Sequence, residues 1–224
     1  MLSKAKIGLM LGAAALSLLT GCGEHGFMSI PTNSSKLAEA KTDSITPCFF
    51  AGRGLDENDM RLFAATGAGD ITQVEQLIAA GANINAADSL KRTPLFAAVF
   101  CNHPQSINLL IDKGSDMNAR DFSGMSPLHA AVAVGAMDAA KALIAKGANL
   151  DIQNTAGRTP LHLAAATNQI AMVELLLEHG ANAQARDKNG NAAAFLASDN
   201  GHASVSAALK KWQEKQKAQA HKPG

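Results

Sequence analysis

The fold of this chain is decided by residues 159–182, which read TPLHLAAATNQIAMVELLLEHGAN. Thr159 is a favourable N-cap, and Pro160 suits the first helical position, where no backbone N–H is needed. Gly180 follows a leucine-rich run and can adopt the positive φ that ends a helix. The Asn-Gln pair at 168–169 interrupts the apolar pattern. We therefore predict two short helices with a turn at this pair.

The same features recur along the chain at a fixed spacing. A Gly corner returns every 33 residues, at Gly81, Gly114, Gly147 and Gly180. A Pro-Leu box keeps the same interval, in the segments 93–95, 126–128 and 159–161. Two markers that stay in phase indicate a tandem array, in which each repeat packs only on its neighbours and the product is an extended surface.

A 33-residue period with a Thr-Pro-Leu-His box and a Gly-Ala corner resembles the ankyrin-repeat family. The resemblance implies an all-α solenoid of about five helix-turn-helix repeats with projecting hairpin loops. The expected repeats are 55–87, 88–120, 121–153, 154–186 and 187–219. The first and the last lack the box, as is expected of terminal repeats that have one solvated face.

The N-terminus carries a different signal. Lys4 and Lys6 precede an apolar stretch, residues 7–19, which is shorter than the about 20 apolar residues of a transmembrane helix. We therefore predict that residues 1–21 are a secretory signal peptide. The sequence Leu-Thr-Gly-Cys that ends at Cys22 resembles the bacterial lipobox, which implies cleavage before this cysteine and a lipid on it. The alternative is an ordinary signal peptide with a chance cysteine.

The lipobox resemblance also sets the expected localisation. A lipidated Cys22 implies the bacterial periplasm and a membrane anchor, and Gly23 favours the outer membrane over the inner one. Residues 22–54 are expected to be a tether, and residues 220–224 a basic tail. Near the end of the tether, the apolar run 48–50 is expected to pack on the first repeat.

The formal charge argues against binding to nucleic acid. The chain has 20 Lys and Arg against 19 Asp and Glu, and removal of residues 1–21 leaves 18 against 19. Phosphate binding needs a clustered excess of Lys and Arg. Residues 210–224 carry +4, which favours a solvated helix end over a contact with anionic lipid, and the rest of the mature chain carries −5. That body could steer the protein towards a basic partner.

The histidines are the main candidates for chemistry. His129 and His162 occupy the same repeat position, 33 residues apart. In ankyrin repeats this His bonds the neighbouring Thr and the loop backbone, so the resemblance implies a structural role. No Cys or His pair has zinc-ligand spacing, and no phosphate-binding glycine loop or nucleophile motif is present. We expect no enzyme activity, metal or cofactor; the alternative is a divergent hydrolase that uses the histidines.

Two cysteines remain once Cys22 is lipidated. Cys48 lies in the tether and Cys101 at the end of a first helix. In an oxidising compartment they can form a disulfide, which would close a loop of about 50 residues and contribute roughly 3–4 kcal/mol. The sequence leaves a disulfide and two thiols equally open, because it does not give the separation of the Cα atoms.

The family resemblance also indicates a binding surface. Partners of ankyrin proteins meet the loop tips and the ends of the first helices, on the concave face. Apolar residues with Arg at such positions have the composition of an interface core. The predicted partner-binding residues are Leu90, Arg92, Phe100, Phe122, Met125, Val134 and Arg158. The alternative is that residues 23–54 cover this surface within the same chain.

These features predict a non-catalytic module that binds another protein, with no nucleic acid and no small-molecule substrate. Two biological roles stay open. One is an immunity protein that neutralises a toxin acting in the periplasm, such as a lipase of type VI secretion, as some exported bacterial ankyrin proteins do. The other is a scaffold or support factor for an envelope stress or redox enzyme.

Overall fold

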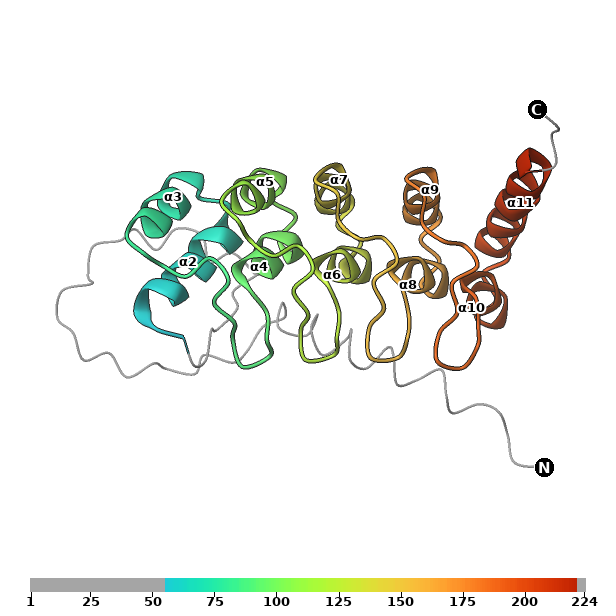
Figure 1. Cartoon of the computed structure of the whole chain (residues 1–224), viewed down its shortest axis with the longest axis horizontal. Coiled ribbons are helices and arrows are strands. Elements are labelled where there is room, and N and C mark those ends of the chain that lie inside the picture. The colour runs from blue at the N-terminus through green and yellow to red at the C-terminus, as the bar shows by residue number, and fades with distance from the viewer. Residues whose placement is uncertain (1–54, 221–224) are drawn as a thin grey trace, which may run out of the picture. The chain divides into compact units, whose positions relative to one another are not determined.

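The computed structural model describes residues 55–220, which form a row of five helix pairs (Figure 1). The first helices make one layer: α2 (Glu57–Ala68), α4 (Pro94–Phe100), α6 (Pro127–Val134), α8 (Pro160–Ala166) and α10 (Ala193–Asp199). The second helices make the other layer: α3 (Ile71–Ala79), α5 (Pro104–Asp112), α7 (Met137–Ala145), α9 (Ile170–Glu178) and α11 (Ala203–Ala220). Hairpin loops project beyond the first layer. The ten helices, without a strand in this part of the chain, confirm the predicted all-α solenoid.

The local sequence explains where the helices begin and end. Ser126 caps α6 in a capping box, in which its hydroxyl accepts the N–H of His129 and the His129 ring accepts the N–H of Ser126. Gly180 follows α9 with a φ of +94°, in the left-handed region that was predicted for a helix stop. Asn168 adopts a φ of +60° in the turn after α8. Asn tolerates this conformation better than most residues, although glycine adopts it more readily.

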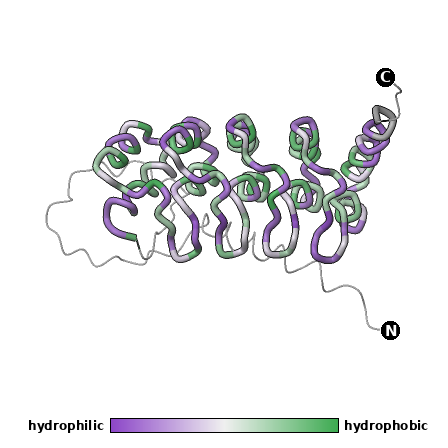
Figure 2. Tube along the Cα trace, viewed as in Figure 1, coloured by the Kyte–Doolittle hydropathy of each residue, from purple (hydrophilic) through white to green (hydrophobic). Residues whose placement is uncertain are grey.

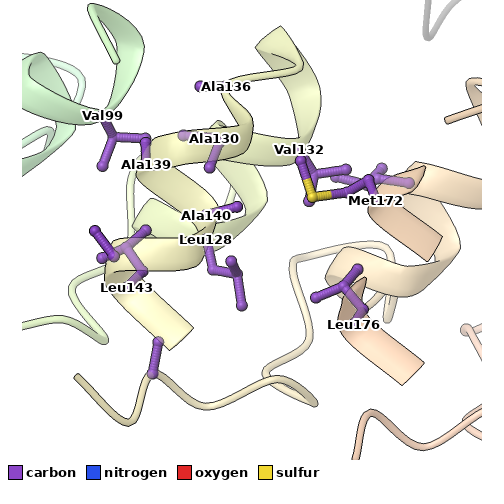
Figure 3. Close-up of a cluster of buried hydrophobic side chains, with 14 of the residues drawn as sticks. Val99, Leu128, Ala130, Val132, Ala136, Ala139, Ala140, Leu143, Met172 and Leu176 are labelled. Atoms are coloured by element: carbon purple, nitrogen blue, oxygen red, sulfur yellow. The ribbon is translucent and has the colours of Figure 1, made fainter. Parts of the chain in front are cut away.

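Small side chains let the helices approach closely. Ala130 and Ala131 of α6 are fully buried between neighbouring helices. Larger residues fill the remaining space, and Figure 3 shows Leu128 on α6 near α7 and Met172 of α9 reaching Val132. One apolar cluster therefore runs from repeat to repeat, which is how a repeat that cannot bury its own apolar face becomes stable in an array.

The two ends of the array are closed differently. α2 has 12 residues, and the side chain of its N-cap Asp56 accepts the N–H of Asp59. α11 has 18 residues, against nine in α9, and packs Trp212 against the core. Phe195 of α10, in the last helix pair of the described residues, remains 53% exposed. Figure 2 shows hydrophobic residues along the first helices and mainly hydrophilic residues around the hairpin loops.

No helix between residues 55 and 220 combines the length and the apolar character that a bilayer-spanning helix needs. The predicted signal peptide, the lipidation site Cys22 and the apolar run 48–50 lie outside the described residues. The membrane anchor therefore stays a prediction from the sequence.

Candidate functional site

Each hairpin loop is shaped by an Asp or Asn at its first position. Asp88 Oδ1 accepts the N–H groups of Leu90 and Arg92, at 2.8 and 2.9 Å. The same two bonds recur at Asp121, Asn154 and Asp187. In this Asx-turn geometry a short side chain takes the place of a backbone acceptor. The result is four equivalent loop tips, which we call the tip edge: residues 88–92, 121–125, 154–158 and 187–191.

Neighbouring tips are hydrogen-bonded to one another. The bonds are Phe122 N–H to Leu90 O (2.9 Å), Thr155 N–H to Ser123 O (3.1 Å) and Lys188 N–H to Ala156 O (3.1 Å). The tip edge is thus a ladder of backbone bonds, and side chains on adjoining tips keep a fixed spacing. Such pre-organisation lowers the entropy that a binding surface loses when a partner docks.

The two box histidines hold these loops against the first helices. His129 Nε2–H donates to Arg158 O of the following loop at 2.8 Å, and its Nδ1 accepts from Ser126 Oγ at 2.9 Å. The equivalent bonds of His162 go to Asn191 O at 3.0 Å and to Thr159 Oγ1 at 2.9 Å. The predicted structural role of both histidines is confirmed.

Burial keeps both imidazole rings neutral. The pKa of His129 is lowered to about 4, mainly by desolvation; the bond to Arg158 O opposes this shift, and the positive charge of Arg120 adds to it. Desolvation likewise lowers the pKa of His162. Each ring donates from Nε2 and accepts at Nδ1, so both nitrogens are committed to bonds within the array. Neither ring is placed to act as a general base.

Two of the predicted partner-binding residues lie inside the loops rather than on their surface. Arg92 donates from Nε and Nη2 to Asp88 Oδ2, at 2.8 and 2.6 Å, and its side chain is 11% exposed. Arg158 is 14% exposed and holds Nε 3.6 Å from Asp187 Oδ2, an ion-pair distance that is too long for a hydrogen bond. Both arginines thus neutralise a fully buried carboxylate, which removes them from the exposed surface.

Three other predicted residues are exposed apolar side chains. Phe122 is 75% exposed, Leu90 44%, and Val134 at the end of α6 39%. Phe122 and Leu90 lie on adjoining tips, because the backbone bond described above joins them. Phe100 and Met125 are only partly exposed and pack against the core. The structure therefore concentrates the exposed apolar surface of the tip edge at Leu90 and Phe122, which we call the tip patch.

Lys91 is a feature of this patch that the sequence analysis missed. Its φ is +59°, in the left-handed region, whereas the equivalent residues of the other tips are Gly124, Gly157 and Gly190, with φ of +72°, +74° and +80°. A side chain in this conformation costs about 1 kcal/mol. Aligning the four tips with one another would have revealed the exception. Backbone strain of this kind clusters at functional sites, so it adds weight to the tip patch.

Sites for chemistry are sparse in the described residues. No group of three or more His, Cys, Asp or Glu within residues 55–220 could hold a metal ion. A groove of about 820 Å³ between the end of α9 and α11 is lined by apolar and amide side chains, including Trp212. A groove of about 280 Å³ between α7 and α9 contains Lys141, Glu174 and Glu178 but no Ser, Cys or His. Neither groove presents a hydroxyl or thiol nucleophile beside a histidine.

Cys101 lies at the C-cap of α4 and is partly exposed. Its possible disulfide partner, Cys48, is outside the described residues, so a disulfide and two thiols stay equally open. Lipidation of Cys22 stays a prediction.

Comparison with known proteins agrees with the geometry. The family model for ankyrin repeats (three copies) matches residues 62–154 and again residues 128–219. The chain belongs to the ankyrin-repeat family. A search of the curated proteins found no significant match to it. Ankyrin repeats are generic modules of protein–protein interaction, and proteins of this family are typically non-catalytic.

Proposed function

We propose that this ankyrin protein is a non-catalytic binding module of the bacterial envelope. A lipid on Cys22 holds it to the membrane, and a partner protein binds the tip edge and the adjoining ends of the first helices. The observation that carries the proposal is the tip patch, where Phe122 is 75% exposed next to Leu90 on a hydrogen-bonded ladder of loops.

The tip patch has the features of a binding hot spot. An exposed aromatic side chain that enters a pocket of the partner contributes far more affinity than the surrounding contacts. Single exposed apolar residues are common on protein surfaces. Here two lie on adjoining tips, and Lys91 beside them departs from the glycine of the other tips. The repeat fold requires none of these three residues, which supports a role in binding.

Site-specific photocrosslinking tests the binding surface. A photoreactive amino acid at Phe122 should crosslink a partner in cells, whereas the same amino acid at Ile170, an exposed apolar position on α9, should not. Phe122→Ser should weaken binding of the crosslinked partner by at least about tenfold, the 1–2 kcal/mol of a hot spot. Equal crosslinking at both positions, or unchanged affinity, would remove the tip patch from the interface.

Lys91→Gly separates binding from folding. The substitution should raise the free energy of unfolding by up to about 1 kcal/mol, because glycine adopts the left-handed φ without strain. It should at the same time weaken partner binding, because the loop becomes more flexible and the cation is lost. A variant that is more stable and binds the partner with unchanged affinity would show that Lys91 is outside the interface.

Fractionation tests the anchor independently of binding. Wild type should sediment with membranes, whereas Cys22→Ala should be soluble or retained as an uncleaved precursor. If both forms partition alike and both have lost residues 1–21, the lipoprotein assignment is wrong and the binding surface is unaffected.

We further propose that the partner is a toxin acting in the periplasm, which a membrane-tethered binder would meet where the toxin attacks. The neighbouring open reading frame supplies the test: a toxic product should kill cells that lack this chain, and Phe122→Ser should lose the protection. Equal killing with and without the chain would end the immunity role. Binding to a stress or redox enzyme would favour the scaffold role instead.

A further inference from the structure

The acidic residues of the tip edge are turned inward. Asp88, Asp121 and Asp187 each accept N–H bonds from their own loop. The side chains of Asp88 and Asp187 are fully buried, each against an arginine, and Asp121 is half-buried. The tip edge therefore presents little negative charge to solvent.

The cations of the same edge face solvent. Lys91 and Lys188 are exposed on the first and fourth tips, and Arg120 and Arg186 are exposed directly before the second and fourth. The exposed acidic residues of these loops lie earlier, close in sequence to the ends of α5 and α7: Asp116 and Asp151. The outermost part of the loops is consequently electropositive.

The net charge of residues 22–209 has the opposite sign, mainly because of the first repeat. Residues 22–209 carry −5, and residues 55–87 alone have five acidic residues against one Arg. Salt screens exposed charges over about 8–10 Å, so a partner at the tips responds mainly to the cations nearby. The expectation that the body steers a basic partner applies to the first repeat rather than to the tip edge.

The tip patch lies among these cations. Lys91 follows Leu90 on the first tip, and Arg120 comes two residues before Phe122. Arg120 Nη1 donates to Gln153 O at 2.5 Å, a bond that fixes the guanidinium beside the next loop. An exposed aromatic anchor thus has two exposed cations near it, of which Arg120 is held by a hydrogen bond.

We infer that the tip patch binds an acidic protein surface, in which an apolar pocket receives Phe122 and carboxylates face Lys91 and Arg120. The inference rests on the proposed function for the existence of a partner, and it adds the chemistry of that partner. The two kinds of contact act on different rates: the buried anchor sets how long the complex lasts, and the rim charges set how fast it forms.

Association kinetics test the inference, with the partner that photocrosslinks at Phe122 as the ligand. Lys91→Glu should lower the association rate constant about five- to tenfold at 50 mM salt and less than about twofold at 500 mM. Lys91→Gln should give a smaller decrease in the same direction. Phe122→Ser should instead raise the dissociation rate constant at least about tenfold.

Two matched variants serve as controls. Lys113→Glu makes the same change of charge in the same repeat, but at the C-cap of α5 in the other layer. Phe195→Ser removes an exposed Phe that lies on α10 rather than on a tip. Both should leave the two rate constants within about twofold of wild type.

The outcomes separate the inference from the proposed function. If a partner crosslinks at Phe122 but Lys91→Glu leaves association unchanged or faster, the acidic partner is refuted and the binding surface stands. Equal decreases in Lys91→Glu and Lys113→Glu would also refute the inference, because net charge rather than the tip edge would then govern association. If nothing crosslinks at Phe122, the proposed function fails and the inference fails with it.

Discussion

One position of the repeat holds histidine in the middle of the array and phenylalanine on either side. At intervals of 33 residues this position is Phe63, Phe96, His129, His162 and Phe195. The first four are buried, whereas Phe195 is 53% exposed. His129 and His162 bond the loop that follows their helix, whereas Phe63 and Phe96 are held by apolar packing.

In the histidine repeats the side chain at this position makes specific hydrogen bonds, and in the phenylalanine repeats it makes apolar contacts. His129 bridges Ser126 and the carbonyl of Arg158. Phe96 packs near Phe100 instead, with ring centroids 6.4 Å apart. Thr93, the residue equivalent to Ser126, has a buried hydroxyl with no hydrogen-bond partner among the described residues. Histidine therefore satisfies the polar groups around it, and phenylalanine leaves one unsatisfied in exchange for more buried apolar area.

One backbone geometry is thus stabilised in two ways that differ in their response to pH. A buried neutral histidine loses its advantage when acid protonates it, whereas phenylalanine does not titrate. The middle of the array should therefore be more sensitive to acid than its N-terminal end.

The largest effect is expected from Phe96→Ala. Removing a fully buried aromatic side chain should lower the free energy of unfolding by about 3–5 kcal/mol, measured by urea unfolding with far-UV circular dichroism. Phe195→Ala is the matched control, because it changes the same residue at the same repeat position where the ring is exposed. A similar loss in both variants would mean that burial does not govern the contribution of this position.

A smaller loss is expected from His162→Ala. The substitution leaves Thr159 Oγ1 and Asn191 O without their partner and should cost about 2–3 kcal/mol. Trp212 is the single tryptophan of the chain and lies in the last helix, so its fluorescence reports on the repeat that His162 holds. His179→Ala, at an exposed C-cap, should cost less than about 0.5 kcal/mol. If Trp212 unfolds at the same urea concentration in wild type and His162→Ala, the histidine bond does not couple the repeats.

Low pH should destabilise the histidine repeats through protonation of His129. Its pKa is about 4 in the folded protein, below the 6.5 of an unperturbed histidine. The unfolded state therefore binds a proton first as the pH falls, and stability that is complete above pH 6.5 is lost progressively towards pH 4. The loss should reach about 2 kcal/mol by pH 5, with a further loss from His162 in the same direction.

His129→Phe tests this pH dependence, because it introduces the residue type that the preceding repeat has at the same position, Phe96. The variant should be less stable than wild type at pH 7.5, because Ser126 and Arg158 O lose their bonds, and the deficit should shrink or reverse at pH 5. Urea unfolding at both pH values measures the difference. Parallel stability curves for the two proteins would show that His129 does not titrate on unfolding.

Most of the fold could be predicted from the sequence, because local signals agree with the repeat period. Gly180 ends α9 as expected, and His129 and His162 make the bonds that their box position implies. Each signal acts over a few residues and recurs at the same spacing, so an error in one repeat is corrected by the others. Neighbouring repeats then pack on one another without distant contacts in the chain.

The binding surface was less predictable, because exposure depends on partners that repeat position does not specify. Arg92 and Arg158 occupy the same position, but one pairs with Asp88 of its own loop and the other approaches Asp187 of the next. The difference arises because Asn154 replaces the aspartate at the start of the third tip. Lys91 escaped notice since its residue type gives no sign of a left-handed backbone; only the glycines at the equivalent positions reveal it.

The smallest expected effect comes from removing one hydroxyl group, in a histidine repeat and in a phenylalanine repeat. Thr159→Val removes a hydroxyl that bonds His162 and should cost about 1 kcal/mol, whereas Thr93→Val removes one that has no partner among the described residues and should be neutral or slightly stabilising. Both residues are buried N-caps before a Pro-Leu pair, so the difference between the two variants reports mainly the histidine bond. The difference in stability is measured from the urea midpoints of the two variants, provided that the slope of the free energy of unfolding against urea concentration is unchanged. An equal cost at both sites would show that Thr93 gains a partner in solution, and the contrast between the histidine and phenylalanine repeats would then rest on pH dependence alone.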